Sequence, residues 1–173
     1  MIELINTNDP AVVQRLVTLE EEAFGAGGLN IWHMVPIIRH GRVFALRRNG
    51  EIVGAIQFLV DWEDRNKAYV VGISIAKEWR GRNLGTELFA GSLKELRKED
   101  IAEVELTVAP DNAAAIRVYR DKLGFRSVGV LTDEYGAGED RLIMTKELDS
   151  RDNAFTQETQ SLVSDSATRD RLM

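Results

Sequence analysis

The segment from Ala68 to Lys98 constrains the fold of this chain more than any other. Its apolar run, Ala68 to Ala76, has the length and composition of a buried strand. A loop containing two glycines follows, and an amphipathic stretch with helical spacing then ends near Lys98. A strand, a glycine loop and a helix in this order are typical of α/β domains. The sequence therefore predicts an α/β fold with a loop of special geometry at one strand end.

The other elements give the order β-α-α-β-β-β-α-β-α-β-β around a mixed central sheet. We expect a strand at 1–5, a helix at 10–24 capped by Asp9 with Pro10 in its first turn, and a helix at 29–38. Asn49-Gly50 between apolar runs predicts a hairpin. A strand at 102–109, a helix at 113–123 and a strand pair at 125–131 and 141–148 complete the domain. Pro36 and Pro110 are expected at element boundaries.

The composition of the 173 residues fits one globular domain and excludes several kinds of site. Its 28 acidic and 22 basic side chains give a formal net charge of -6, which disfavours nucleic acid or an anionic membrane as partner. Without cysteine, the chain has no disulfide, thiolate metal site or cysteine nucleophile. Two histidines are too few for a histidine-rich metal cluster, so no metal is expected.

The chain is expected to divide into a domain at residues 1–149 and a polar tail at 150–173. Composition changes at Ser150, and we expect the tail to pack on a neighbouring subunit, as in a homodimer. The first residues lack a basic stretch followed by an apolar one, and no apolar run approaches the ~20 residues of a membrane span. We therefore expect a cytoplasmic protein.

The loop after the Ala68–Ala76 run has the features of a pyrophosphate cradle. Open N–H groups and the positive end of the dipole draw anions to a helix N-terminus. Small residues let the backbone approach a ligand closely, arginines add charge, and a hydroxyl stands in the first turn. The alternative is a tight turn that needs glycine only for its geometry. The candidate phosphate-binding residues are Arg80, Gly81, Arg82, Asn83, Leu84, Gly85 and Thr86.

This loop resembles the acetyl-CoA site of the GNAT superfamily of N-acetyltransferases, whose signature is Gln or Arg, two residues, Gly, any residue, then Gly or Ala. Arg80, Leu84 and Gly85 fit the signature, whereas Asn83 stands where the family has its first glycine. Asn tolerates a left-handed backbone better than other residues that carry a side chain. The resemblance covers about residues 1–148. It implies a GNAT-like acyl-CoA N-acyltransferase fold and acetyl-CoA as co-substrate.

A second motif supports the same resemblance. Asn112 and Tyr119, followed by Gly124 and Phe125, are similar to the family's pattern of Asn, Ala, Tyr and Gly-Phe. By this resemblance Asn112 contacts the pantetheine arm, and Tyr119 donates a proton to the departing CoA thiolate. The backbone donors for the oxyanion would come from the preceding strand, at Ile73, Ser74 and Ile75.

The general base is less well defined by the sequence. The chain is closest in pattern to the ribosomal-protein N-terminal (alanine) acetyltransferase branch, where a strand glutamate five residues before the motif Asn is the base. This chain has Thr107 there. Glu105 shares a strand face with Thr107, because side chains alternate, and could act through water. Glu21 and Glu22 are the other candidates.

The sequence thus predicts direct acetyl transfer from acetyl-CoA to a primary amine in a ternary complex. Tyr135 would help to grip a peptide N-terminus, by resemblance to the same branch. The acidic residues at 20–22, 133 and 134 would suit a cationic small-molecule amine. A protein N-terminus and a small-molecule amine therefore both remain as acceptors. The alternative function is a non-catalytic acyl-CoA-binding or regulatory module of the same fold.

Overall fold

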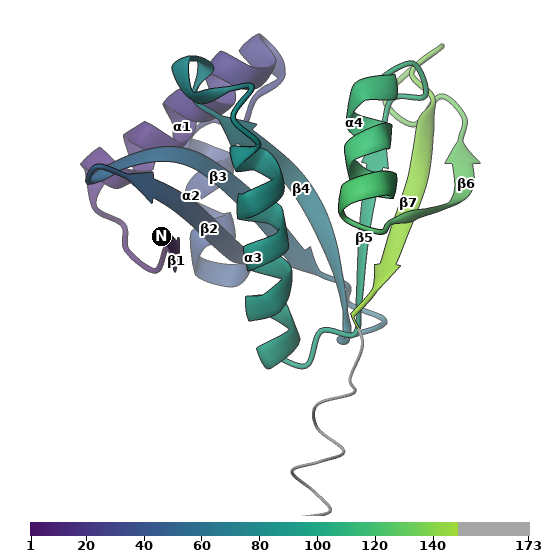
Figure 1. Cartoon of the computed structure of the whole chain (residues 1–173), viewed down its shortest axis with the longest axis horizontal. Coiled ribbons are helices and arrows are strands. Elements are labelled where there is room, and N and C mark those ends of the chain that lie inside the picture. The colour runs from purple at the N-terminus through teal and green to yellow at the C-terminus, as the bar shows by residue number, and fades with distance from the viewer. Residues whose placement is uncertain (149–173) are drawn as a thin grey trace, which may run out of the picture.

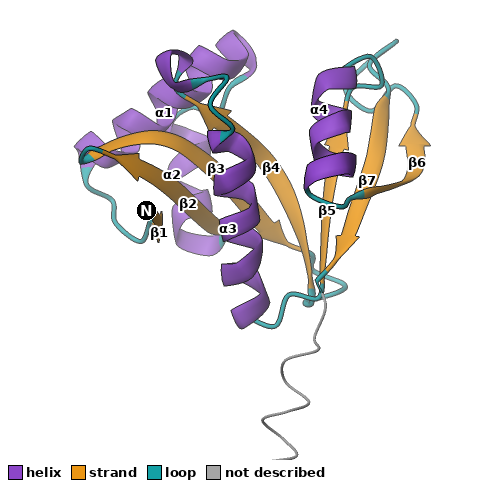
Figure 2. Cartoon of the chain, viewed as in Figure 1, coloured by secondary structure: helices purple, strands orange, loops and turns teal. Residues whose placement is uncertain are grey.

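A seven-stranded mixed sheet runs through the protein, with helices on both faces (Figure 1, Figure 2). The structure, a computed structural model, describes residues 1–148. The strands lie in the order β1-β2-β3-β4-β5-β7-β6, and β4 and β5 are parallel neighbours. Their bounds are β1 Ile2–Leu4, β2 Arg42–Arg48, β3 Glu51–Val60, β4 Lys67–Ile75, β5 Glu103–Val108, β6 Arg126–Leu131 and β7 Arg141–Glu147. The helices are α1 Pro10–Phe24, α2 Ile31–His40, α3 Leu84–Lys98 and α4 Ala113–Arg117. The element order and the fold class predicted from the sequence are confirmed.

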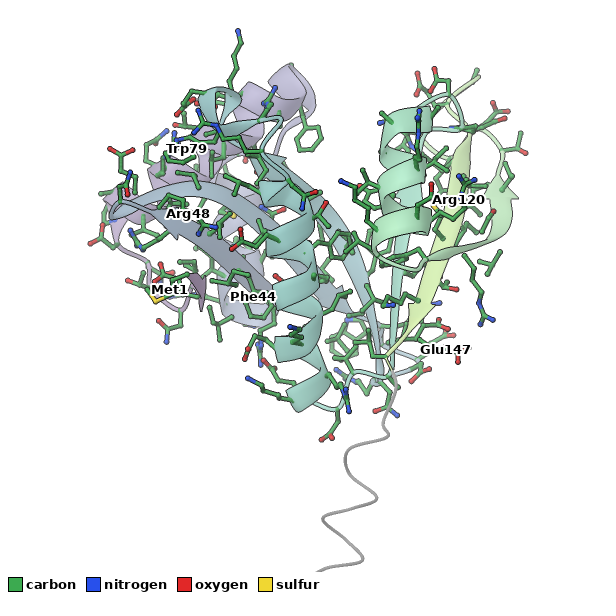
Figure 3. All side chains as sticks on the ribbon, viewed as in Figure 1. Met1, Phe44, Arg48, Trp79, Arg120 and Glu147 are labelled. Carbon is green, nitrogen blue, oxygen red and sulfur yellow. The ribbon has the colours of Figure 1, made fainter. Side chains whose placement is uncertain are left out.

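Two apolar cores fill the space between the sheet and its helices. On β2, Phe44 and Leu46 pack toward α3, whereas Val43 and Ala45 belong to the core formed with α1 and α2. This alternation follows from the period of two along a strand. Figure 3 shows Phe44 on the α3 side of the sheet. Because both faces of β2 and β3 are covered, these strands form a rigid support for β4.

The local signals at element ends mostly hold. The Asp9 carboxylate accepts the backbone N–H of Ala11 at 2.8 Å and caps α1, and Asn49-Gly50 turns between β2 and β3. The boundary expected at Pro36 is wrong, because Pro36 lies inside α2, on its exposed side. The helix expected at 113–123 is α-helical to Arg117 and continues as a π-turn over Val118–Lys122.

The sheet opens between β4 and β5, and this opening positions the site. The two strands pair over Lys67–Tyr69 and Glu103–Glu105, although β4 continues to Ile75 and β5 to Val108. Figure 1 shows the strands diverging beyond these pairs, with α3 beside β4 and α4 beside β5 across the gap. Backbone groups along the diverging edges are therefore left for a ligand.

The predicted tail at 150–173 and its packing on a neighbouring subunit lie outside the described residues. None of the helices within residues 1–148 combines the length and hydropathy needed to cross a bilayer.

Candidate active site

A cavity of about 630 Å³ fills the opening between β4 and α4. It is bounded by the end of α1, by β4, by the loop and first turn of α3, and by α4 with its π-turn. Most of the residues that the sequence singled out for acetyl-CoA line this cavity: Ile73, Ser74, Ile75, Arg80, Gly81, Asn83, Leu84, Gly85, Thr86 and Tyr119. Two motifs that are far apart in the sequence thus face each other across one space.

The loop before α3 turns through two left-handed positions. Gly81 has a φ of 75° and Asn83 a φ of 61°. Asn83 is therefore in the conformation that glycine adopts most easily and asparagine better than most. Its side-chain oxygen accepts a hydrogen bond of 2.8 Å from the Lys122 ammonium. This bond connects the loop to the π-turn across the cavity. Lys122 was not singled out in the sequence, because nothing local links residues 39 apart.

The start of α3 fits a pyrophosphate group. The first N–H groups of a helix lack partners within it. In α3 they belong to Leu84, Gly85 and Thr86, and all three residues line the cavity. A Cβ added to Gly85 would meet Ile75 Cγ1 at 3.7 Å, an ordinary contact, so the protein's own packing does not require glycine there. The missing side chain instead leaves room on the cavity side. These residues can hold the pyrophosphate of acetyl-CoA.

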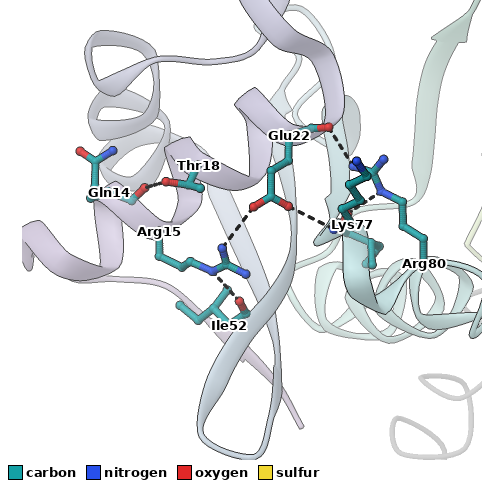
Figure 4. A network of polar contacts seen from close by, with 8 residues as sticks. Gln14, Arg15, Thr18, Glu22, Ile52, Lys77 and Arg80 are labelled. Carbon is teal, nitrogen blue, oxygen red and sulfur yellow. Dashed lines mark hydrogen bonds and ion pairs between the residues drawn. The ribbon is translucent and has the colours of Figure 1, made fainter.

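Arg80 holds the loop in place through the protein itself. Its Nε donates to the Ile75 carbonyl oxygen and its Nη2 to the Glu22 carbonyl oxygen, both at 2.9 Å. The Glu22 carboxylate accepts the backbone N–H of Lys77 at 3.1 Å and pairs with Arg15 (Figure 4). This network joins the end of α1 to the loop before α3. Glu22, a candidate base from the sequence, therefore has structural partners.

Arg82 and Trp79 form the outer side of the same loop. The Arg82 guanidinium lies 4.9 Å from the centre of the Trp79 ring, and its Nη2 donates to the Glu78 carbonyl oxygen at 3.3 Å. Trp79 itself lines the cavity beside the start of α3 (Figure 3). Arg82 thus lies next to the cavity lining, where its charge adds to that of the helix N-terminus.

The two residues of the second motif have different surroundings. The Asn112 side chain accepts the backbone N–H of Ala115 at 3.1 Å and so caps α4. Tyr119 lines the cavity from the π-turn, with its ring packed edge-on against Phe89 at 5.9 Å. Burial raises the pKa of the Tyr119 phenol. Tyr119 therefore keeps its proton at neutral pH, and its hydroxyl can act as a hydrogen-bond donor toward the cavity.

A pair of hydroxyl groups bridges β4 and β5 where the strands separate. The Tyr69 hydroxyl and the Thr107 hydroxyl lie 3.0 Å apart. Burial raises the pKa of Tyr69, and nearby Tyr135 and Glu105 raise it further. Tyr135 is exposed in the β6–β7 loop, with the Arg141 guanidinium 4.8 Å from its ring centre. Sequence reasoning missed Tyr69, although it is a polar group inside an apolar strand.

Glu105 lies directly opposite Tyr69 in the parallel register. Its Oε2 pairs with the Lys67 ammonium at 2.6 Å, and Glu103 also lies within 3.4 Å of that ammonium. The hydrogen bond from Lys67 to Glu105 raises the pKa of Lys67. The candidate base Glu105 therefore lies two residues before Thr107 on β5, with the Lys67 ammonium beside it.

Comparisons with known proteins agree with this geometry. The acetyltransferase (GNAT) family matches residues 12–125. An N-alpha-acetyltransferase of Sulfurisphaera tokodaii is 34% identical over 115 residues, which cover 61% of this chain and 68% of that protein. One from Saccharolobus solfataricus is 31% identical over 110 residues, covering 58% of this chain and 65% of its own length. The ribosomal-protein-S18-alanine N-acetyltransferase of Escherichia coli superposes with a TM-score of 0.72 at 22% identity, covering 86% of this chain and 95% of that one. None of these matches supports the alternative of a non-catalytic module.

Proposed function

Because the chain belongs to the acetyltransferase (GNAT) family and is an acetyl-CoA-dependent N-acetyltransferase, we propose that its acceptor is the α-amino group of a protein N-terminus. The observation that carries this proposal is the match to an N-alpha-acetyltransferase over 115 residues. The position of the exposed Tyr135 beside the Tyr69 hydroxyl supports it, because an aromatic side chain there can cover a bound peptide end.

The cofactor half of the site would be formed by the loop and by β4. Acetyl-CoA supplies the thioester that is attacked. The α3 N-terminus would hold its pyrophosphate, and Arg80 and Arg82 add positive charge. The Ala76 N–H donates to Val53 on β3. By the alternation of an antiparallel pair, the N–H groups of Ile73 and Ile75 then point into the opening, where they can stabilise an oxyanion.

Tyr119 is proposed as the general acid. It lines the cavity, and the cause of its raised pKa is burial, which disfavours the phenolate. A neutral phenol at this position can give its proton to a leaving thiolate. Asn112 would act indirectly, because its capping bond fixes the start of the helix that carries Tyr119.

The ammonium proton of the acceptor is proposed to leave through the Tyr69–Thr107 hydroxyl pair and water toward Glu105. The pair lies at the divergence of β4 and β5, and Glu105 is the partner of Tyr69 in the parallel register. A hydroxyl passes a proton on by accepting one and donating another, so neither side chain needs to ionise. Thr107 thereby takes a place in the path where the related branch has a carboxylate.

Acetylation of matched peptides tests the acceptor. We expect mass spectrometry to locate one acetyl group on the α-amine of a peptide with a free N-terminus, together with release of CoA thiol. The same peptide with a blocked N-terminus and an internal lysine serves as control. Acetylation of the lysine, or turnover with a polyamine or an amino sugar alone, would contradict the proposal. The cytoplasmic location and the homodimer stay predictions.

A further inference from the structure

Glu20 is a buried carboxylate that the proposed chemistry does not use. It is 2% exposed, whereas Glu21 and Glu22 in the same run face solvent. Burial raises the pKa of Glu20, and three hydrogen bonds act against that shift. An ionisable side chain is rarely enclosed to this degree unless partners hold it, so these partners indicate its role.

The two oxygens of Glu20 bind different parts of the site. Its Oε1 accepts the Ser74 hydroxyl at 3.0 Å and Gln57 Nε2 at 3.2 Å. Its Oε2 faces the backbone N–H of Leu29 at 3.5 Å. Ser74 lines the cavity on β4. One side chain of α1 thus joins the strand of the proposed oxyanion donors to the segment Gly25–Leu29, which we call the glycine loop.

The glycine loop also folds back on the Glu20 backbone. A Cβ added at Gly28 would lie 2.7 Å from the Glu20 carbonyl oxygen, so a side chain there would push the loop away. Phe24, directly before the loop, lines the cavity and is 49% exposed. Gly72 on β4 has no side chain, and a Cβ built there would lie 3.9 Å from Phe24 Cε2 and 3.7 Å from Glu20 Oε2. The Phe24 ring and the Glu20 carboxylate therefore both lie close to Gly72. The residue that leads into the loop therefore lies at the β4 side of the cavity.

The bond from Gln57 to Glu20 leaves another polar group unpaired. Gln57 is fully buried, and within residues 1–148 its Oε1 has no hydrogen-bond partner. An unpaired buried acceptor destabilises a fold, and such groups need an explanation. Stability alone therefore does not account for this cluster, whereas a requirement to hold Glu20 in one orientation does.

We propose that Glu20 is a positioning residue that fixes the glycine loop against β4, so that Phe24 and the loop hold the acceptor beside the acetyl group. The inference rests on the proposed function only for the choice of a peptide as acceptor. The bonds to Ser74 and Gln57 anchor the carboxylate on the cofactor side, and the bond to Leu29 carries that position to the acceptor side.

The variant Glu20→Gln distinguishes the contacts on the cofactor side from the contact with Leu29 on the acceptor side. The glutamine oxygen can still accept from Ser74 and Gln57, but its amide nitrogen then meets the Leu29 N–H, donor against donor. We expect the KM of the peptide to rise about tenfold, the value of one lost hydrogen bond, while the Kd of acetyl-CoA stays the same. Amide hydrogen exchange at residues 25–30 should become faster. Glu95→Gln, an exposed carboxylate on α3, is the matched control and should change none of these.

Gly28→Ala tests the same idea with Glu20 intact, and it decides the matter if Glu20→Gln does not fold. Its methyl group presses on the Glu20 carbonyl oxygen, so exchange in the loop and the peptide KM should rise together. An unchanged peptide KM in both variants overturns the proposal, as does an equal loss of acetyl-CoA affinity. If the parent enzyme acetylates no peptide, the proposed acceptor is wrong. The amine that it does acetylate then replaces the peptide in the same measurements.

Discussion

Gly85→Ala should make the protein more stable and its cofactor affinity weaker. Gly85 lies in the first turn of α3, where alanine loses less backbone entropy than glycine. The added Cβ would meet Ile75 Cγ1 at 3.7 Å, which is an ordinary contact. We therefore expect the free energy of unfolding to rise by about 0.5 kcal/mol, part of the interior difference between the two residues.

The same methyl group should interfere with acetyl-CoA. It would stand in the first turn of α3, whose residues Leu84, Gly85 and Thr86 line the cavity and carry the unpaired N–H groups. Displacing a phosphate from one of these donors removes a charge-assisted hydrogen bond, worth about 1.5 to 3 kcal/mol. The Kd of acetyl-CoA should therefore increase about 10- to 100-fold.

Calorimetric titration and urea unfolding of the same preparations measure both effects. Gly81→Ala is the contrasting variant, because Gly81 has a φ of 75° and a Cβ there would meet nothing within 4 Å. It should lose about 1 to 2 kcal/mol of stability through backbone strain alone. An unchanged Kd in Gly85→Ala would refute the pyrophosphate assignment, and a loss of stability would refute the helical geometry at Gly85.

Tyr119→Phe should lower kcat about 10²- to 10⁴-fold in a thiol-release assay and leave the Kd of acetyl-CoA unchanged; normal turnover would exclude it as the acid. Asn83→Ala should destabilise the protein by about 1 to 2 kcal/mol in urea unfolding, since alanine is strained at a φ of 61° and the bond from Lys122 is lost. Asn83→Gly should lose less, and equal losses would contradict this account. Burial raises the pKa of folded Glu20 above its unfolded value, so the stability that Glu20 contributes is complete below the unfolded pKa and is lost as pH rises through the folded pKa. The parent should therefore become less stable relative to Glu20→Gln as the pH rises above ~4.3, the ordinary pKa of glutamate, and parallel stability curves would show that burial does not raise the Glu20 pKa.

Local signals were sufficient for most of the fold. Asp9 with Pro10, and Asn49 with Gly50, set a helix start and a turn through their own backbone preferences, and both appear as predicted. The prediction that Pro36 marks an element boundary was wrong. A proline on the exposed side of a short helix is tolerated when packing of the opposite face holds the helix. The left-handed position of Asn83 was also predictable, since few other residues adopt it.

The proposed acceptor side of the site depends on contacts between distant segments. Tyr69 and Thr107 meet because β4 and β5 are parallel neighbours that separate at that point, a register that neither strand specifies alone. Glu20 could have been found, however. It follows Leu16 by four residues and Val17 by three, so it falls on the buried face of α1, whereas the run of three glutamates suggested a solvated surface.

Strand β4 is the element through which both substrates would be aligned. Past Tyr69 its edge toward β5 is open, and Ile73 and Ile75 can turn their N–H groups to the thioester. Arg80 ties its end to the loop before α3, and Glu20 ties Ser74 to the glycine loop. A displacement of β4 would therefore move the cofactor and the acceptor together, which preserves the attack geometry. Loss of only one of these contacts, at Arg80 or at Glu20, should misalign the two substrates. The KM should then rise for one substrate and stay the same for the other.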